Sequence, residues 1–160
     1  MKYGIIGTGA LGGYFGGRLA RIGKDVHFLL HSDYDHVKAN GLKVDSVKGD
    51  FIINSINAYK STKDMPKCDV ILVCLKTTNN HLLPELLHPI LHDETIVILV
   101  QNGLGAEEDL EAMMPDLKIA GALAFICARK LGAGHIEHMD EGNLSLGAHS
   151  KINKLKLIEI

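Results

Sequence analysis

A glycine-rich turn close to the N-terminus constrains the fold of this chain more than any other feature. Residues 7–12 have the sequence Gly-Thr-Gly-Ala-Leu-Gly, which matches the pattern GxGxxG. An apolar run ending at Ile6 precedes the turn, and seven glycines lie from Gly4 to Gly17. The pattern alone is weak, but between a strand and a helix it is typical of a dinucleotide-binding site. A tight turn without a ligand needs only one or two glycines, so seven favour the ligand-binding interpretation.

The residues after the turn complete one strand–helix–strand unit. Apolar side chains that recur at helical intervals over 10–22 mark one face of a helix, and they are Leu11, Phe15, Leu19 and Ile22. Gly23 stands where the C-cap of that helix is expected. The run 26–30 is typical of a buried second strand, which completes the βαβ unit.

Each glycine of the turn has a physical role in such a site. Gly7 permits the tight bend, Gly9 leaves room for a pyrophosphate against the backbone, and Gly12 lets the helix pack close to the strand. The first turn of the helix offers free N–H groups and the positive end of its dipole to the phosphates. The predicted cofactor-binding segment therefore comprises Gly7, Thr8, Gly9, Ala10, Leu11 and Gly12.

The remaining periodicities predict an α/β fold. Two runs are apolar throughout, as parallel strands covered on both faces require: Val70–Leu75 and Thr95–Val100. The other expected elements are helices over Asp33–Ala39, Leu82–Ile90 and Glu107–Met114, and a β-hairpin over Leu42–Val47 and Phe51–Ile53. Towards the C-terminus we expect a strand over Lys118–Ala122, two or three antiparallel strands over 124–146 that are broken at 132–134 and 141–142, and helical spacing over 151–160. These elements predict a Rossmann-type, doubly wound, mostly parallel sheet with an added hairpin and antiparallel C-terminal strands.

Composition limits the classes of protein to which the chain can belong. Its 160 residues are enough for one domain, and a net charge of −2 without a block of like charge argues against nucleic-acid or membrane-surface partners. No apolar run approaches the roughly 20 residues of a membrane span. Three cysteines without a CxxC spacing predict a reducing, cytoplasmic location. The nine histidines show no HExxH pattern, and Pro89 separates His88 from His92, so no metal site is expected.

The end of the second strand bears on the choice between NAD and NADP. Sites selective for NAD place an acidic residue there, where it binds the ribose hydroxyls. Here His31 and Ser32 follow the strand, and both are donors that could hold a 2′-phosphate. The sequence therefore favours NADP, while Asp33 is near enough to leave NAD open. A solvent-exposed loop histidine is the alternative interpretation of His31.

Three separated motifs resemble those of the ketopantoate reductase (2-dehydropantoate 2-reductase) family, in its N-terminal NADP-binding domain. The first is the glycine-rich opening GTGALGGYFGGRLARIG over 7–23. The second is Val-Cys-Leu-Lys over 73–76, similar to a family strand that ends in lysine, and the third is Val-Gln-Asn-Gly-Leu-Gly over 100–105, similar to a QNGxG loop. The hairpin over 41–53 also fits this family, so the resemblance covers nearly the whole chain.

The resemblance implies an NADPH-dependent reduction of ketopantoate to pantoate by hydride transfer, in pantothenate and coenzyme A synthesis. It places Lys76 and Asn102 beside the nicotinamide and the substrate, as catalytic and cofactor-binding residues. Independently of any family, both follow apolar strands, and ligands bind at the carboxyl ends of strands in open α/β sheets. An ammonium there can attract the carboxylate of a 2-keto acid, and a carboxamide can donate or accept hydrogen bonds. A solvated strand-end lysine and an ordinary Asn-Gly turn are the alternatives.

This chain departs from the family pattern in two respects. Family members usually carry arginine at the position of His31, and their general-acid lysine and substrate-binding glutamate belong to a helical C-terminal domain that this sequence lacks. We therefore expect residues 1–160 to be a dinucleotide-binding domain, truncated near its C-terminal end, that binds cofactor but has little or no reductase activity alone. The expected partners are a small 2-keto acid and the missing helical domain, and a homodimer stays open.

Other functions would keep the same fold. One is a dehydrogenase for another 2-keto acid or a β-hydroxy acid, and another is a non-catalytic dinucleotide-sensing module, which would not need Lys76 or Asn102. A structural domain with a degenerate site is a further alternative, and it would bind neither NADPH nor NADH.

Overall fold

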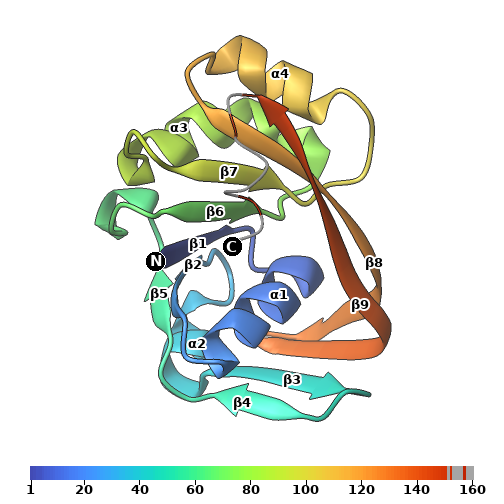
Figure 1. Cartoon of the computed structure of the whole chain (residues 1–160). Coiled ribbons are helices and arrows are strands. Elements are labelled where there is room, and N and C mark those ends of the chain that lie inside the picture. The colour runs from blue at the N-terminus through green and yellow to red at the C-terminus, as the bar shows by residue number, and fades with distance from the viewer. Residues whose placement is uncertain (151, 153–156, 158–160) are drawn as a thin grey trace.

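The computed structural model describes residues 1–150, 152 and 157, and these form an α/β fold around one curled, nine-stranded sheet (Figure 1). The strands lie in the order β4-β3-β9-β8-β7-β6-β1-β2-β5. Their bounds are β1 Lys2–Ile6, β2 Asp25–Leu29, β3 Leu42–Ser46, β4 Phe51–Ile53, β5 Asn57–Tyr59, β6 Val70–Val73, β7 Ile96–Leu99, β8 Lys118–Gly132 and β9 His135–Ser150. The helices are α1 Ala10–Arg21, α2 Tyr34–Asn40, α3 Leu83–Leu87 and α4 Ala106–Met113, with 3-10 turns η1 Thr62–Asp64, η2 Thr77–Leu82 and η3 His88–Ile90.

The parallel part of the sheet runs from β5 through β2, β1, β6 and β7 to β8. β6 and β7 are buried at every residue, because side chains pointing to either face enter a core. Leu72 belongs to the core that surrounds α1, while Ile71 belongs to the core formed with α3 and α4. Helices on both faces confirm the predicted doubly wound, mostly parallel sheet.

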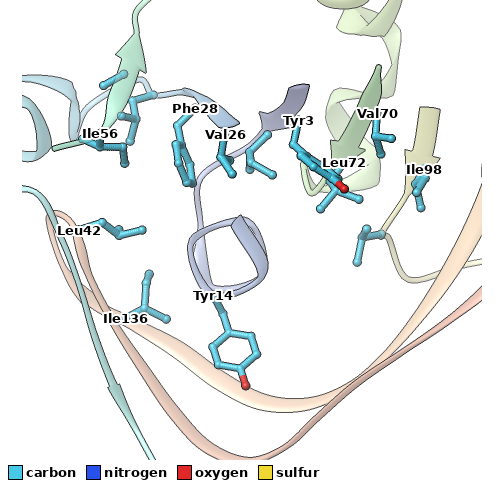
Figure 2. Packing of buried hydrophobic residues seen from close by; sticks show 14 of the residues in the cluster. Tyr3, Tyr14, Val26, Phe28, Leu42, Ile56, Val70, Leu72, Ile98 and Ile136 are labelled. Atoms are coloured by element: carbon cyan, nitrogen blue, oxygen red, sulfur yellow. The ribbon is translucent and has the colours of Figure 1, made fainter. Parts of the chain in front are cut away.

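Helix α1 lies inside the curl of the sheet, and its glycines allow the strands to approach it. A Cβ on Gly16 would lie 2.5 Å from the Phe28 ring of β2, and one on Gly13 would lie 2.8 Å from Ile136 of β9. Figure 2 shows these strands packing on different sides of the helix. Gly13 and Gly16 therefore serve packing and not the turn, so the number of glycines is weaker support for ligand binding than the sequence alone indicates.

The predicted apolar stripe of α1 is not its most buried face. Leu11, Phe15 and Leu19 are half-buried, and Ile22 is 67% exposed, because the closest contacts with the strands are made by glycines. The C-cap is Ile22, one residue before the predicted Gly23, which still ends the helix: Gly23 has φ +81° and its N–H donates to the carbonyl of Ala20 at 3.0 Å.

The predicted hairpin over 42–53 is confirmed as the antiparallel pair β3–β4. It does not lie beside the main parallel strands, because β3 pairs in parallel with the N-terminal end of β9, at His135–His138. The long β8–β9 hairpin therefore bends the sheet back beneath α1 (Figure 1). The helix lies between the parallel strands and the β3–β4 end of the sheet.

The predicted break at 141–142 is wrong as a strand end. β9 continues through it as a bulge, in which Glu141 has φ +60° and Gly142 has φ +101°. The buried side chain of His138 supports this bulge, with Nε2 3.2 Å from the Glu141 carbonyl and Nδ1 2.8 Å from the Ser46 hydroxyl. The residue pair Glu141-Gly142 is typical of a turn in sequence. Here its positive φ angles form a bulge, which only shifts the register between β8 and β9.

Three short elements, β5, η1 and η2, were not predicted. β5 has only three residues, too short to show a periodicity, and η2 is a 3-10 segment without an apolar stripe. The helix predicted over 82–90 exists as α3 with η3, and Pro84 lies in its first turn as expected. The helix predicted over 151–160 falls on residues that, apart from 152 and 157, lie outside those described.

Candidate active site

A cavity of about 740 Å³ lies at the carboxyl ends of the parallel strands, and this volume is in the range of small-molecule sites. The segments following β1, β2, β5 and β6 line it, together with one side chain from β8. The lining includes Gly7, Thr8, Gly9, His31, Ser32, Asp33, Lys60, Lys63, Cys74, Lys76, Glu85 and Lys130. The structure therefore brings the glycine turn, the end of β2 and Lys76 to one cavity.

The glycine turn fits a diphosphate. Gly7 has φ +96°, and a Cβ there would lie 2.8 Å from the backbone nitrogen of Leu75. A Cβ on Gly12 would lie 2.2 Å from the Gly7 carbonyl oxygen, so this glycine is required for α1 to pack against the turn. Gly9 differs from both, because its Cβ would meet nothing within 4 Å and the residue lines the cavity. The space beside Gly9 is where a ligand can reach the backbone.

The start of α1 leaves donors for such a ligand. Gly9 is the N-cap and has no side chain to cap the helix, while its carbonyl accepts the first helical hydrogen bond from Gly13 at 2.8 Å. The N–H groups of Ala10, Leu11 and Gly12 belong to the first helical turn, where they have no partner within the helix. Thr8 has another role, since its hydroxyl donates to the Leu29 carbonyl at 2.9 Å and ties the turn to β2.

The end of β2 presents a buried acid beside two exposed residues. His31 and Ser32 are exposed and line the cavity. The Ser32 hydroxyl donates to Oδ1 of Asp33 at 3.2 Å. Oδ2 of Asp33 accepts from the Gly134 N–H at 3.0 Å and lies 2.6 Å from Nζ of Lys130. Burial alone would raise the pKa of Asp33, but the hydrogen bonds from Lys130 and Gly134 outweigh it and the pKa lies below its usual value.

Three lysines of the cavity were not found from the sequence. Lys60 and Lys63 follow β5, a strand too short to be predicted, and Lys130 comes from β8, a hundred residues beyond β2. Lys60 is already engaged, because Nζ lies 3.1 Å from Asp35 and 4.7 Å from the centre of the Tyr34 ring. With Lys76 the lining holds four lysines against the carboxylates of Asp33 and Glu85, so the cavity favours an anionic ligand.

Lys76 lies where the sequence placed it, three residues beyond β6, with its side chain exposed at the cavity wall. The backbone beside it is held from the loop after β7. Nε2 of Gln101 donates to the Leu75 carbonyl at 2.8 Å and to Oδ1 of Asn80 at 2.7 Å, and Nδ2 of Asn80 donates back at 3.1 Å. Gln101, which the sequence analysis did not single out, therefore positions the segment that carries Lys76.

Asn102 is not brought into this cavity. Its side chain is exposed, and among the residues that the structure describes it is not part of the lining. It does follow Gln101 at the same edge of the sheet, two strands from β1. Its predicted contact with nicotinamide and substrate stays a prediction.

Other chemistry in and around the cavity is limited. Burial raises the pKa of the Cys74 thiol to about 12, so this thiol is protonated at neutral pH and unsuited to act as a nucleophile. Across residues 1–150, 152 and 157, no three His, Cys, Asp or Glu side chains are grouped so that they could hold a metal ion. None of the helices in this part of the chain has the length and apolar character needed to cross a bilayer.

Comparison with known proteins assigns the chain and its fold to a family. The family model described as "Ketopantoate reductase PanE/ApbA" matches residues 3–151. The chain belongs to the ketopantoate reductase family. It is 53% identical over 149 residues to the 2-dehydropantoate 2-reductase of Nostoc sp. (strain PCC 7120), covering 93% of this chain and 47% of that protein.

Solved structures of the ketopantoate reductase family share this fold. The 2-dehydropantoate 2-reductase from Geobacter metallireducens superposes with a TM-score of 0.94 at 37% identity, covering 99% of this chain and 53% of that one. A D-mandelate dehydrogenase, solved with NADH and anilino(oxo)acetate, shares the fold at 21% identity and a TM-score of 0.81, covering 91% of this chain and 48% of its own. The chain thus spans about half the length of the relatives that it matches.

Proposed function

We propose that this chain is the cofactor-binding half of an NADPH-dependent reductase that converts ketopantoate to pantoate by hydride transfer. The observation that carries the proposal is the shared cavity: the open backbone at Gly9, the end of β2 and the Lys76 ammonium all line it. Membership of the ketopantoate reductase family supports the choice of substrate. The pattern of free cysteines agrees with a reducing, cytoplasmic location.

Different residues of this chain would bind the diphosphate and the adenosine of the cofactor. Backbone N–H groups of Gly9, Ala10 and Leu11 would bind the diphosphate at the N-terminus of α1. His31 and Ser32 would hold the adenosine end, where a 2′-phosphate adds two negative charges to a site already rich in lysines. The bound cofactor would supply the hydride.

Lys76 would act on the substrate beside the nicotinamide. Its ammonium attracts the carboxylate of a 2-keto acid and so orients the ketone for attack. Gln101 fixes the backbone on which Lys76 stands, and Asn102 follows in the same loop. The alkoxide formed by hydride transfer needs a proton, and we assign its donor to the second half that relatives possess.

A dehydrogenase for another 2-keto or β-hydroxy acid is the second candidate. The D-mandelate dehydrogenase structure supports it, because that protein has the same fold and was solved with NADH. The two candidates differ in the cofactor that this half of the protein should prefer.

Fluorescence titration of the chain with NADPH and NADH tests the proposal. We expect saturable binding of both with NADPH at least about tenfold tighter, which corresponds to about 1.4 kcal/mol. Preference for NADH would favour the second candidate. Binding of neither dinucleotide would overturn both and leave a domain with a degenerate site.

A further inference from the structure

An ion pair between two distant parts of the chain lines the cavity. Asp33 follows β2 and caps α2, while Lys130 comes from the β8–β9 hairpin, and the two meet at 2.6 Å between Oδ2 and Nζ. The Asp33 side chain is only 10% exposed, whereas that of Lys130 is 35% exposed and lines the cavity. The lysine therefore has one side toward the acid and the other open to a ligand.

Asp33 is the acid that would otherwise favour NAD. Acidic residues just beyond the second strand accept hydrogen bonds from ribose hydroxyls, and their charge repels a 2′-phosphate. Here the carboxylate is occupied, because Lys130, the Gly134 N–H and the Ser32 hydroxyl all contact it. It also stays ionised at neutral pH, since these contacts hold its pKa below the usual value.

The other lysines near this end do not do the same. Lys60 pairs with the exposed Asp35, and Lys63 belongs to the 3-10 turn η1 that follows β5. Of the lysines that line the described cavity, only Lys130 forms an ion pair with Asp33 and so offsets its charge.

We propose that Lys130 is a specificity-determining residue that selects NADPH, by cancelling the charge of Asp33 and presenting its ammonium to the 2′-phosphate. The inference rests on the proposed function, because it requires the dinucleotide to bind in this cavity. It assigns part of the phosphate site to the long hairpin and not to the β2 loop alone, where His31 stands. The β8–β9 hairpin, which bends the sheet around α1, would then also contribute to the selection of NADPH over NADH.

Binding titrations with small probes test Lys130 without catalysis. The probes are adenosine 2′,5′-bisphosphate and adenosine 5′-monophosphate, followed by NADPH and NADH, with wild type and Lys130→Met. We expect the variant to bind the bisphosphate and NADPH about tenfold or more weakly, because a phosphate loses its cation and faces an uncompensated carboxylate. Binding of the monophosphate and NADH should be unchanged or tighter, so the preference for NADPH should be lost.

Arg129→Met is the matched control. Arg129 neighbours Lys130 on the hairpin and pairs with Glu137 at 2.5 Å, but it is outside the lining of the described cavity. It removes the same charge from the same strand, so a general electrostatic effect would change both variants alike. We expect Arg129→Met to keep the wild-type ratio of the two affinities.

A double variant protects the test against misfolding, since losing Lys130 leaves a buried charge at Asp33. Lys130→Met combined with Asp33→Asn removes both charges, and its NADPH affinity should lie between those of wild type and Lys130→Met. If either variant folds and keeps the wild-type ratio of NADPH to NADH affinity, the inference is overturned and Lys130 has a purely structural role. A wild-type chain that binds neither dinucleotide would instead overturn the proposed function, so the two failures are distinguishable.

Discussion

At the residue scale, two glycines of the same turn differ in the space around their Cα atoms. Gly12 packs against the backbone of the turn, because a Cβ there would lie 2.2 Å from the Gly7 carbonyl oxygen. Gly9 instead faces open space in the cavity. The backbone of Gly9 has φ −88°, which alanine also adopts. One methyl group can therefore separate the folding role of the turn from its binding role.

We expect Gly9→Ala to fold and to lose dinucleotide binding. Alanine at this N-cap should lower the free energy of unfolding by only about 1 kcal/mol. Its methyl group projects into the space assigned to the diphosphate, so NADPH affinity should fall at least about tenfold. Gly12→Ala is the comparison, and its clash should cost about 3 kcal/mol or more by denaturant titration. Wild-type NADPH affinity in folded Gly9→Ala would place the diphosphate elsewhere.

Asp33 should make stability depend on pH in the acid range. Its pKa in the folded state is below that in the unfolded state, near 3.9, so its contribution is complete above that value and is lost as pH falls through the folded pKa. Asp33→Asn should therefore be less stable than wild type by about 1–2 kcal/mol at pH 7, and the difference should shrink below about pH 4. Urea titrations across pH 3–7 measure it, with Asp35→Asn as an exposed control. A difference that persists unchanged at pH 3 would contradict the assignment.

At the element scale, α1 is held by strands on several sides, and its glycines are not equivalent. Gly16 packs against the buried ring of Phe28, while a Cβ on Gly17 would lie 3.3 Å from the half-buried Phe51. Alanine is favoured over glycine by about 1 kcal/mol within a helix, so packing alone decides the sign of each substitution.

We expect Gly16→Ala to destabilise the chain by about 1–3 kcal/mol, despite the gain in helix propensity, because neither Phe28 nor Ile5 can move away. Gly17→Ala should stay within about 0.5 kcal/mol of wild type, since its neighbours need to give only slightly. Thermal denaturation of both variants checks this. Equal changes in stability for the two variants would show that helix propensity, and not close packing, determines the effect of alanine in α1.

The sequence predicted elements well where one physical signal was sufficient. β6 and β7 are apolar throughout because both faces are buried, and the hairpin carries its own turn. β5 was not predicted because three residues are too few to show a periodicity. The bulge at Gly142 was predicted as a strand end because glycines with positive φ occur both in turns and in bulges. In the site, Lys76 could be found because it follows an apolar strand, whereas Lys130 reaches Asp33 through pairing that no local pattern reveals.

At the scale of the whole molecule, the chain contains the cavity proposed to bind the cofactor, but it covers about half the length of its relatives. We expect it to bind NADPH while reducing ketopantoate far more slowly than a full-length family member, because the donor of the proton to the alkoxide is assigned to the other half. Steady-state oxidation of NADPH at saturating ketopantoate measures this, with the full-length relative run in parallel. Comparable turnover numbers would show that the residues described here suffice for the reaction.

Nuclear magnetic resonance of the labelled 17.4 kDa chain tests most directly whether the diphosphate binds at the glycine turn. On titration with NADPH, the amide signals of Gly7, Gly9 and Ala10 should shift most, together with those of Ser32 and Lys76. Signals beside the separate apolar groove near Phe15 and Leu144 should stay in place. Shifts concentrated at that groove, with the glycine turn unaffected, would contradict the assignment.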